Sequence, residues 1–89
     1  MNLDFCTSKM ILKEEHVYFG GMSLSYRFLA RSRRGVCSYA VGVRLGREYC
    51  EAELGGEPDS SYEHYQKIVR GCVTPCTLEE VVRDLCDYV

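Results

Sequence analysis

Hydrophobic and polar residues alternate along several segments in the first half of the chain. Within residues 22–30 the even-numbered side chains are apolar and the odd-numbered ones are polar, with Leu29 as the exception. Residues 37–45 and 50–54 alternate in the same way, and a shorter stretch, 17–19, precedes them. A period of two residues is typical of a β-strand with one buried face. The pattern therefore predicts four strands.

Short turn motifs separate these strands. Gly20-Gly21 suits the left-handed dihedral angles of a two-residue hairpin turn. We centre the other two turns on Arg33-Arg34 and Gly46-Arg47. This register pairs Val17 with Leu24, Phe28 with Tyr39, Tyr26 with Val41, and Val43 with Cys50. All the paired apolar residues then share one face, which predicts a four-stranded antiparallel meander.

The second half of the chain changes to helical spacing. After the break at 55–58, Asp59, Ser60 or Ser61 can cap a helix. Its apolar positions are Tyr62, Tyr65, Ile68, Val69 and Cys72. Pro75 marks a linker to a second helix.

Thr77 and Glu80 have the spacing of a capping box, in which each side chain accepts a hydrogen bond from the backbone amide of the other. The amphipathic stripe that follows consists of Leu78, Val81, Val82, Leu85 and Cys86. Together the elements predict an α+β fold, a four-stranded antiparallel meander with two C-terminal helices packed on one face (ββββαα). We expect a poorly ordered N-terminal tail over residues 1–12 and a single α+β domain over 13–89.

Composition agrees with one small folded domain. The chain has 89 residues, of which 46% are hydrophobic and 27% charged, and this argues against disorder. The longest apolar run near the start, Met10–Leu12, is much shorter than the roughly 7–15 residues of a secretory signal. No stretch approaches the roughly 20 apolar residues of a membrane span. We therefore expect a cytoplasmic protein, most simply of a bacterium, without a membrane partner.

The six cysteines carry two alternative interpretations. In a secreted protein they would form a disulfide framework whose pairing the sequence leaves open. In a reducing cytosol free thiols are the default, and buried cysteine then behaves as a small hydrophobic residue. Cys37, Cys50, Cys72 and Cys86 fall on the expected apolar faces. We therefore favour free cysteines that pack in the core as small hydrophobic residues.

A metal site or a catalytic site has little support. Cys72 and Cys76 have a spacing that zinc sites allow, but only Cys86 and His64 are nearby to complete the ligands. Neither His64 nor His16 belongs to a motif for nucleophilic catalysis. We assign no catalytic residue, metal or cofactor, and keep a zinc or thiol sensor as one alternative.

Charge is strongly segregated along the chain. Residues 22–47 contain six arginines and no acidic residue, whereas residues 48–89 contain ten acidic and three basic residues. The six are Arg27, Arg31, Arg33, Arg34, Arg44 and Arg47. They can form a surface for a protein partner or for nucleic acid, or pair across strands with Glu51 and Glu53. RNA-binding sheets also expose aromatic residues, and here only Tyr49 is expected on the outward face.

Three segments resemble a bacterial family. They are Tyr26–Leu29, Tyr39–Val43, and Val73–Pro75 followed by Leu78–Leu85. The chain is similar over residues 22–86 to a family of short bacterial proteins known as a domain of unknown function. Its pattern has a Tyr-x-Leu-Leu strand, a Tyr-Gly-Ile-type strand and a closing Val-Thr-Pro-x-x-Leu-x-x-Val-Val-x-Asp helix. Ala40 and the pair Cys76-Thr77 depart from it, and the resemblance implies no activity, cofactor or partner.

The leading hypothesis is a non-enzymatic protein-interaction or regulatory domain, which binds an unknown protein or a second copy of itself. A small nucleic-acid-binding domain that uses the arginine-rich sheet face is the alternative. The zinc or thiol sensor, built on Cys72, Cys76 and Cys86, is the third hypothesis.

Overall fold

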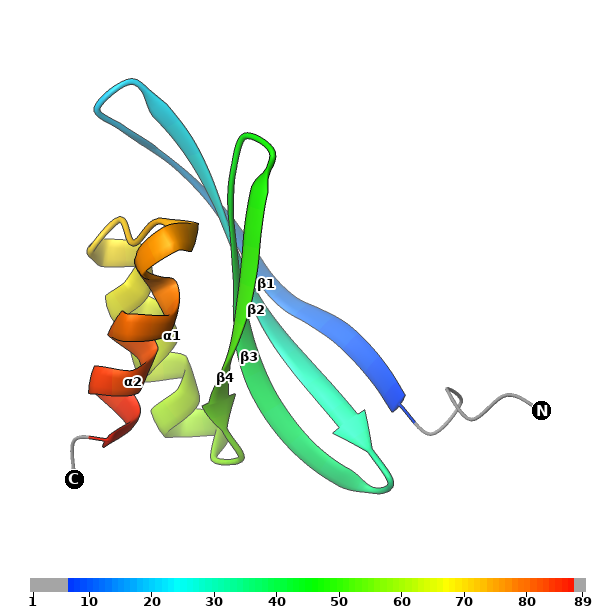
Figure 1. Cartoon of the computed structure of the whole chain (residues 1–89). Helices are drawn as coiled ribbons and strands as arrows, with labels where there is room; N and C mark the ends of the chain where they lie inside the picture. The colour runs from blue at the N-terminus through cyan, green and yellow to red at the C-terminus, as the bar shows by residue number, and fades with distance from the viewer. Residues whose placement is uncertain (1–6, 88–89) are drawn as a thin grey trace.

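The computed structural model describes residues 7–87, which form one antiparallel sheet and two helices packed on it (Figure 1). The strands follow one another in the order β1-β2-β3-β4 across the sheet. Their bounds are β1 Thr7–Phe19, β2 Met22–Arg33, β3 Val36–Leu45 and β4 Glu48–Gly55. The helices are α1 Pro58–Arg70, a short 3-10 helix Pro75–Thr77, and α2 Leu78–Asp87. The predicted ββββαα fold is confirmed.

The register between β2 and β3 differs from the predicted one by two residues. Phe28 pairs with Val41 and not with Tyr39, and Tyr26 pairs with Val43 and not with Val41. The turn is centred one residue later, on Arg34 and Gly35, which both adopt positive φ (53° and 80°). A two-residue displacement leaves every side chain on the same face. The apolar pattern is therefore equally satisfied by both registers, and turn geometry decides between them.

The other two predicted registers are confirmed. Val17 pairs with Leu24, and Val43 pairs with Cys50. Gly20 and Gly21 both have positive φ (58° and 80°), as a tight hairpin turn between β1 and β2 requires.

β1 begins earlier than predicted. Residues 7–12 belong to the strand, so the prediction of a poorly ordered tail is wrong for them, whereas residues 1–6 lie outside the described part of the chain. The pairing with β2 shifts between Ile11 and Lys13, which leaves Leu12 as a bulge. A bulge changes the phase of the alternation. The first half of β1 therefore does not show a continuous period of two in the sequence.

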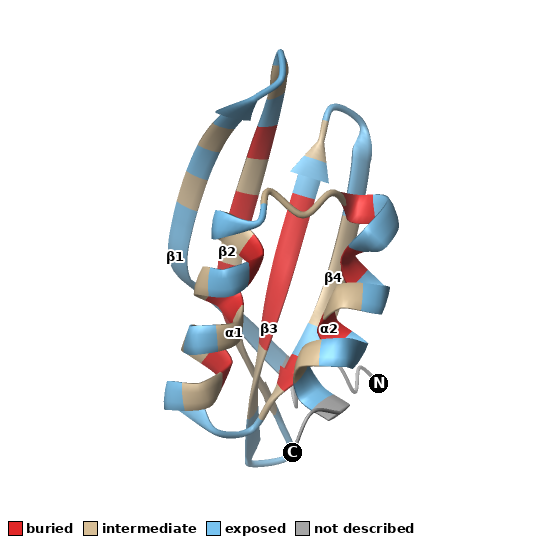
Figure 2. Cartoon of the chain, turned by 90° about the vertical axis from the view of Figure 1, so that its left-hand side faces the viewer, coloured by how far each residue is buried: buried red, intermediate tan, exposed pale blue. Residues whose placement is uncertain are grey.

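The hydrophobic core lies between the helices and one face of the sheet, which we call the inner face (Figure 2). Phe28 is at the centre of an aromatic group, with ring centroids 5.7 Å from Tyr39, 5.3 Å from Tyr62 and 5.2 Å from Tyr65. Each large apolar side chain buried in this way stabilises the fold by about 1.5–3 kcal/mol. The core residues are Leu24, Tyr26, Phe28, Val41, Val43, Leu54, Tyr65, Ile68, Leu78 and Val82.

The helices begin differently from the sequence prediction. α1 starts at Pro58 with Glu57 as its N-cap, so none of Asp59, Ser60 and Ser61 caps it. Proline at the first position has a suitable φ and lacks an amide that would need a partner. The capping box of the second helix is also not observed: the Thr77 hydroxyl donates to the Thr74 carbonyl oxygen (3.4 Å). The 3-10 helix Pro75–Thr77 is directly continuous with α2, so Thr77 belongs to a helical turn and does not act as an N-cap.

The opposite side of the sheet, the outer face, also has buried residues. Leu29 is 1% exposed and Ala40 is fully buried, although both point away from the helices. In Figure 1 the β2–β3 hairpin and the start of β1 bend away from the helices, which makes the outer face concave at this end. Leu29 and Ala40 pair with each other, and the candidate site is formed by the charged side chains of Arg31, Glu51 and Glu53 on the same face.

Candidate functional site

The six predicted arginines do not form one continuous surface. Arg27, Arg31 and Arg44 lie on the outer face, and Arg33 and Arg34 lie at the end of the β2–β3 hairpin. Arg47 is in the β3–β4 turn, at the opposite end of the sheet (Figure 1). The structure brings Arg31, Arg33 and Arg34 together along one groove and leaves Arg47 far from them.

A carboxylate, Glu51 of β4, organises the middle of the outer face. It accepts hydrogen bonds from Lys9 Nζ at 2.8 Å, from the Arg31 guanidinium and from the Tyr49 hydroxyl. Partial burial raises the pKa of Glu51, but the hydrogen bonds from Lys9, Tyr49 and Arg31 outweigh it and lower this pKa to about 2. Glu51 is therefore a fixed negative charge that holds β1, β2 and β4 together.

Arg31 binds two carboxylates of β4. Its guanidinium also donates to Glu53 at 3.3 Å, so the interpretation of cross-strand pairing with Glu51 and Glu53 is confirmed for Arg31. Arg27 instead forms an ion pair with Glu14 of β1 at 3.1 Å. Lys9 was not predicted as a partner because the bulge at Leu12 reverses the alternation that would place it on the inner face, whereas Glu14 follows the bulge and keeps the alternation of Val17.

The Tyr49 side chain packs against the outer face of the sheet. Its ring lies over Gly42, where an added Cβ would be 2.4 Å from the Tyr49 hydroxyl oxygen. The Arg44 guanidinium lies 4.9 Å from the ring centroid. Burial and the hydrogen bond to Glu51 raise the pKa of Tyr49 to about 12. The aromatic side chain predicted as a stacking platform is thus already covered by an arginine.

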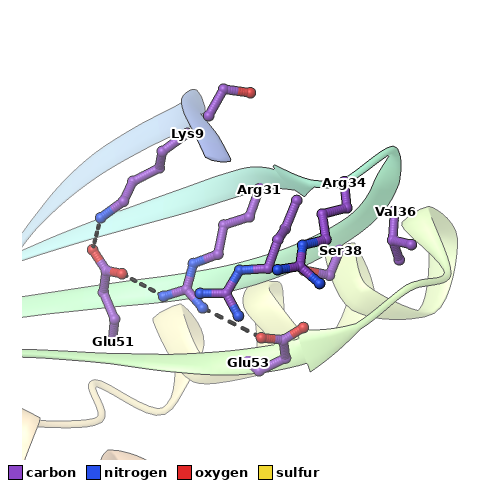
Figure 3. Close-up of a pocket in the computed structure, with 9 residues that line it drawn as sticks. Lys9, Arg31, Arg34, Val36, Ser38, Glu51 and Glu53 are labelled. Atoms are coloured by element: carbon purple, nitrogen blue, oxygen red, sulfur yellow. Dashed lines mark hydrogen bonds and ion pairs between the residues drawn. The ribbon is translucent and has the colours of Figure 1, made fainter. Parts of the chain in front are cut away.

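A groove of about 620 Å³ runs along the concave end of the outer face (Figure 3). We call it the outer-face groove. Arg33 and Arg34 form no ion pair within the described part of the chain, whereas Lys9 and Arg31 do. The groove therefore holds two guanidinium groups, those of Arg33 and Arg34, whose positive charges are not paired with a carboxylate of the described residues. Its lining residues are Ser8, Lys9, Arg31, Arg33, Arg34, Val36, Ser38, Glu51 and Glu53.

The two histidines lie apart from the groove. His16 is exposed on the outer face, as predicted, and its Nδ1 is 3.0 Å from the Ser25 hydroxyl oxygen. Within residues 7–87, no hydrogen bond joins this ring to a carboxylate that could orient it. His64 is half-buried on α1, and its Nδ1 has no hydrogen-bond partner among the described residues.

The cysteines divide into packing residues and exposed thiols. Cys50 and Cys72 pack against the core, as predicted. Cys37 is exposed, so its predicted core position is wrong, because this end of β3 bends away from the helices. Cys86 is also largely exposed rather than in the core, and its thiol donates to the Leu54 carbonyl oxygen at 3.7 Å.

The predicted metal candidates are not assembled into a site. In the described residues, no group of three or more His, Cys, Asp or Glu side chains could hold a metal ion. Cys72, Cys76, Cys86 and His64 therefore do not form a ligand cluster in this structure.

The outer edge of the sheet is a second candidate surface. Among the described strands β1 has a neighbour on one side only, so the backbone groups along its other side pair with no described strand. Three successive apolar residues in its first half are exposed: Met10 by 63%, Ile11 by 49% and Leu12 by 47%. Apolar side chains on an unpaired strand edge mark a site where another strand can add.

Within residues 7–87, no helix is long and apolar enough to cross a membrane. Comparisons of the chain with protein-family models, with curated proteins and with solved structures find no match. The resemblance to a family of short bacterial proteins therefore stays a prediction.

Proposed function

We propose that this chain is a non-enzymatic protein-interaction domain, and that the strand added at the edge of β1 is β1 of a second copy. The observation that carries this proposal is the exposed Met10–Leu12 run on a 13-residue edge strand. Free backbone N–H and C=O groups on such an edge bind an added strand, and its side chains select the partner.

Charge complementarity favours a second copy as the partner. Consider antiparallel pairing of two β1 strands about the midpoint between Ile11 and Leu12. Lys9 then lies opposite Glu14 of the second copy, so that the ion pairs these residues form within each chain, with Glu51 and Arg27, are extended across the two sheets. Opposite charges at such positions contribute about 0.2–1 kcal/mol each. In this register Lys9 and Glu14 both lie on the outer face, and Met10 and Lys13 both lie on the inner face. The pairing thus continues the sheet without inverting either strand.

A cytoplasmic location belongs to the same proposal. Cys37 and Cys76 are exposed thiols that form no disulfide with any described residue. Exposed thiols persist in a reducing compartment and are oxidised or paired outside it. The bacterial origin rests on the family resemblance alone.

Nucleic-acid binding by the arginine-rich face is the weaker candidate. The charges of Arg27 and Arg31 are already bound by carboxylates, and Arg47 lies at the other end of the sheet. The Tyr49 ring, needed for base stacking, lies between the sheet and Arg44.

Sedimentation velocity over a dilution series tests the proposal. We expect the unmodified chain to shift from monomer to dimer as its concentration rises. Met10→Lys places a lysine opposite Lys13 of the second copy and should weaken the dimer about tenfold, because like charges across strands repel. Met10→Glu places an acid opposite the same lysine and should preserve the dimer.

Val36→Lys is the matched control. Val36 is 68% exposed and begins β3, so β2 lies between it and β1. This substitution should leave the dimer unchanged. A strict monomer at every concentration would overturn the proposal. If Met10→Lys and Met10→Glu weakened the dimer equally, the proposed register between the two β1 strands would be overturned. Far-UV circular dichroism verifies that each variant is folded.

A further inference from the structure

We infer that the outer-face groove is a binding site for the phosphate group of a small phosphomonoester. This inference does not rest on self-association: Ser8 and Lys9 of β1 also line the groove, but the donors on which the inference depends, Arg33 and Arg34, lie at the end of the β2–β3 hairpin. The groove, about 620 Å³ in volume, is large enough for a small ligand. It is lined by side chains from all four strands (Figure 3).

The charge of the groove matches a doubly charged anion. Counted over the described residues, its lining contains four basic side chains, from Lys9, Arg31, Arg33 and Arg34, and two carboxylates, Glu51 and Glu53. Four positive and two negative charges leave an excess of two positive charges. A phosphomonoester carries close to two negative charges at neutral pH. Its binding would neutralise this excess.

The two carboxylates are already bound by other groups. Glu51 accepts hydrogen bonds from Lys9, Arg31 and Tyr49, and Glu53 accepts one from Arg31. The donors that remain free among the described residues belong to Arg33 and Arg34, since neither forms an ion pair there. These two arginines are adjacent in the chain, and an anion bound between their guanidinium groups would offset the repulsion of their like charges.

The β2–β3 turn directs these donors into the groove. Arg34 adopts a left-handed conformation (φ 53°), which is uncommon for a residue other than glycine. Figure 3 shows its guanidinium turned back over the strands, towards Arg31 and Ser38, rather than outward into solvent. The turn thus holds Arg34 on the same side of the sheet as Arg31.

A phosphate fits this donor arrangement better than a carboxylate does. A phosphate group offers oxygens in three dimensions, and donors converge here from several strands, including the Ser8 and Ser38 hydroxyls. A carboxylate is planar and has only two oxygens. Among the described residues no aromatic side chain lines the groove, so this part of the chain offers no stacking surface of the kind that single-stranded nucleic acid requires.

The experiment is an NMR titration of the full chain with inorganic phosphate and with phenyl phosphate, at constant ionic strength. The backbone amides of residues 33–38 and the arginine Nε–H groups report binding. We expect saturable shifts confined to the groove, and much weaker shifts with acetate. Arg33→Gln combined with Arg34→Gln should weaken phosphate binding about tenfold or more, because each charge-assisted hydrogen bond is strong.

The matched control combines Arg47→Gln with Arg83→Gln, which changes the net charge by the same amount at exposed positions outside the groove. It should leave phosphate affinity within about twofold, since charges beyond the Debye length are screened. Glu53→Gln should tighten binding, because it removes a negative charge from the lining.

Three results would overturn the inference. The first is the absence of shifts in the groove at millimolar phosphate. The second is equal loss of affinity in both double variants, which would show only a general charge effect. The third is preferential binding of a single-stranded oligonucleotide over phenyl phosphate, which would instead favour nucleic-acid recognition. None of these results depends on whether the chain forms a dimer.

Discussion

The two faces of the sheet are both partly buried, but different interactions close them. The inner face is apolar and is covered by α1 and α2, which pack on it through Tyr65, Ile68 and Leu78. No described helix covers the outer face, where Leu29 and Ala40 are nevertheless buried and where Arg27 and Arg31 form their ion pairs. One face is thus closed by helices, and the other by a network of hydrogen bonds centred on Glu51.

One tyrosine on each face illustrates the difference. The pKa of Tyr26 and that of Tyr49 are both raised to about 12, mainly by burial. The Tyr26 hydroxyl donates to the Val73 carbonyl oxygen at 3.0 Å, and thereby attaches the inter-helix linker to the inner face. The Tyr49 hydroxyl donates to the Glu51 carboxylate. We therefore expect the inner face to be sensitive to lost volume, and the outer face to be sensitive to pH and salt.

The largest effect should come from Phe28→Ala on the inner face. This change removes the ring that contacts Tyr39, Tyr62 and Tyr65, and it leaves a cavity. The free energy of unfolding should fall by about 3–5 kcal/mol, measured by urea denaturation. Tyr18→Ala, at a residue that is 83% exposed, is the control and should change it by less than about 0.5 kcal/mol. Similar losses in both variants would contradict a core centred on Phe28.

Glu51→Gln should have an intermediate effect that depends on pH. The pKa of Glu51 is about 2 in the folded state, against an ordinary value of 4.5. Because the folded-state pKa is the lower one, the unfolded chain binds more protons between these values. The stabilisation is therefore complete above about pH 4.5 and is lost as the pH falls towards 2.

At neutral pH we expect Glu51→Gln to lower the free energy of unfolding by about 2 kcal/mol. The difference from the unmodified chain should shrink as the pH falls from about 4.5 to 2, as followed by denaturant titration at each pH. A difference independent of pH would show that the carboxylate charge does not hold the network together.

The smallest effect should come from Gly42→Ala. An added Cβ would be 2.4 Å from the Tyr49 hydroxyl oxygen, so the ring must move and weaken its contacts with Glu51 and Arg44. We expect a loss of about 1–2 kcal/mol in thermal or chemical denaturation. In a Tyr49→Ser background the same substitution should cost much less, because the clash is absent. An equal cost in both backgrounds would exclude Tyr49 as the cause.

The inner face could be predicted from the sequence, because alternating apolar residues such as Leu24, Tyr26 and Phe28 report directly on burial. The β2–β3 register could not, since both candidate registers put the same residues inside. Arg34 in a left-handed turn decided it, and arginine is not a typical residue for that conformation.

The outer-face groove was only partly predictable. Arg31 and its partners Glu51 and Glu53 follow from strand alternation. Lys9 does not, because the bulge at Leu12 interrupts the pattern that would place it on the same face. The burial of Leu29 also has no sequence signal, since Leu29 lies between Ile11 and Ala40 on the face that the alternation assigns to solvent.

The meander order β1-β2-β3-β4 has a kinetic consequence. Every strand pairs with its neighbour in the chain through a turn of two residues, so no long loop must close before the sheet forms. Proteins dominated by such local contacts cross a smaller entropic barrier than sheets with crossover connections. Each hairpin can therefore form in turn as the chain emerges during synthesis, and the two helices, which follow the strands in the chain, dock onto a sheet that already exists.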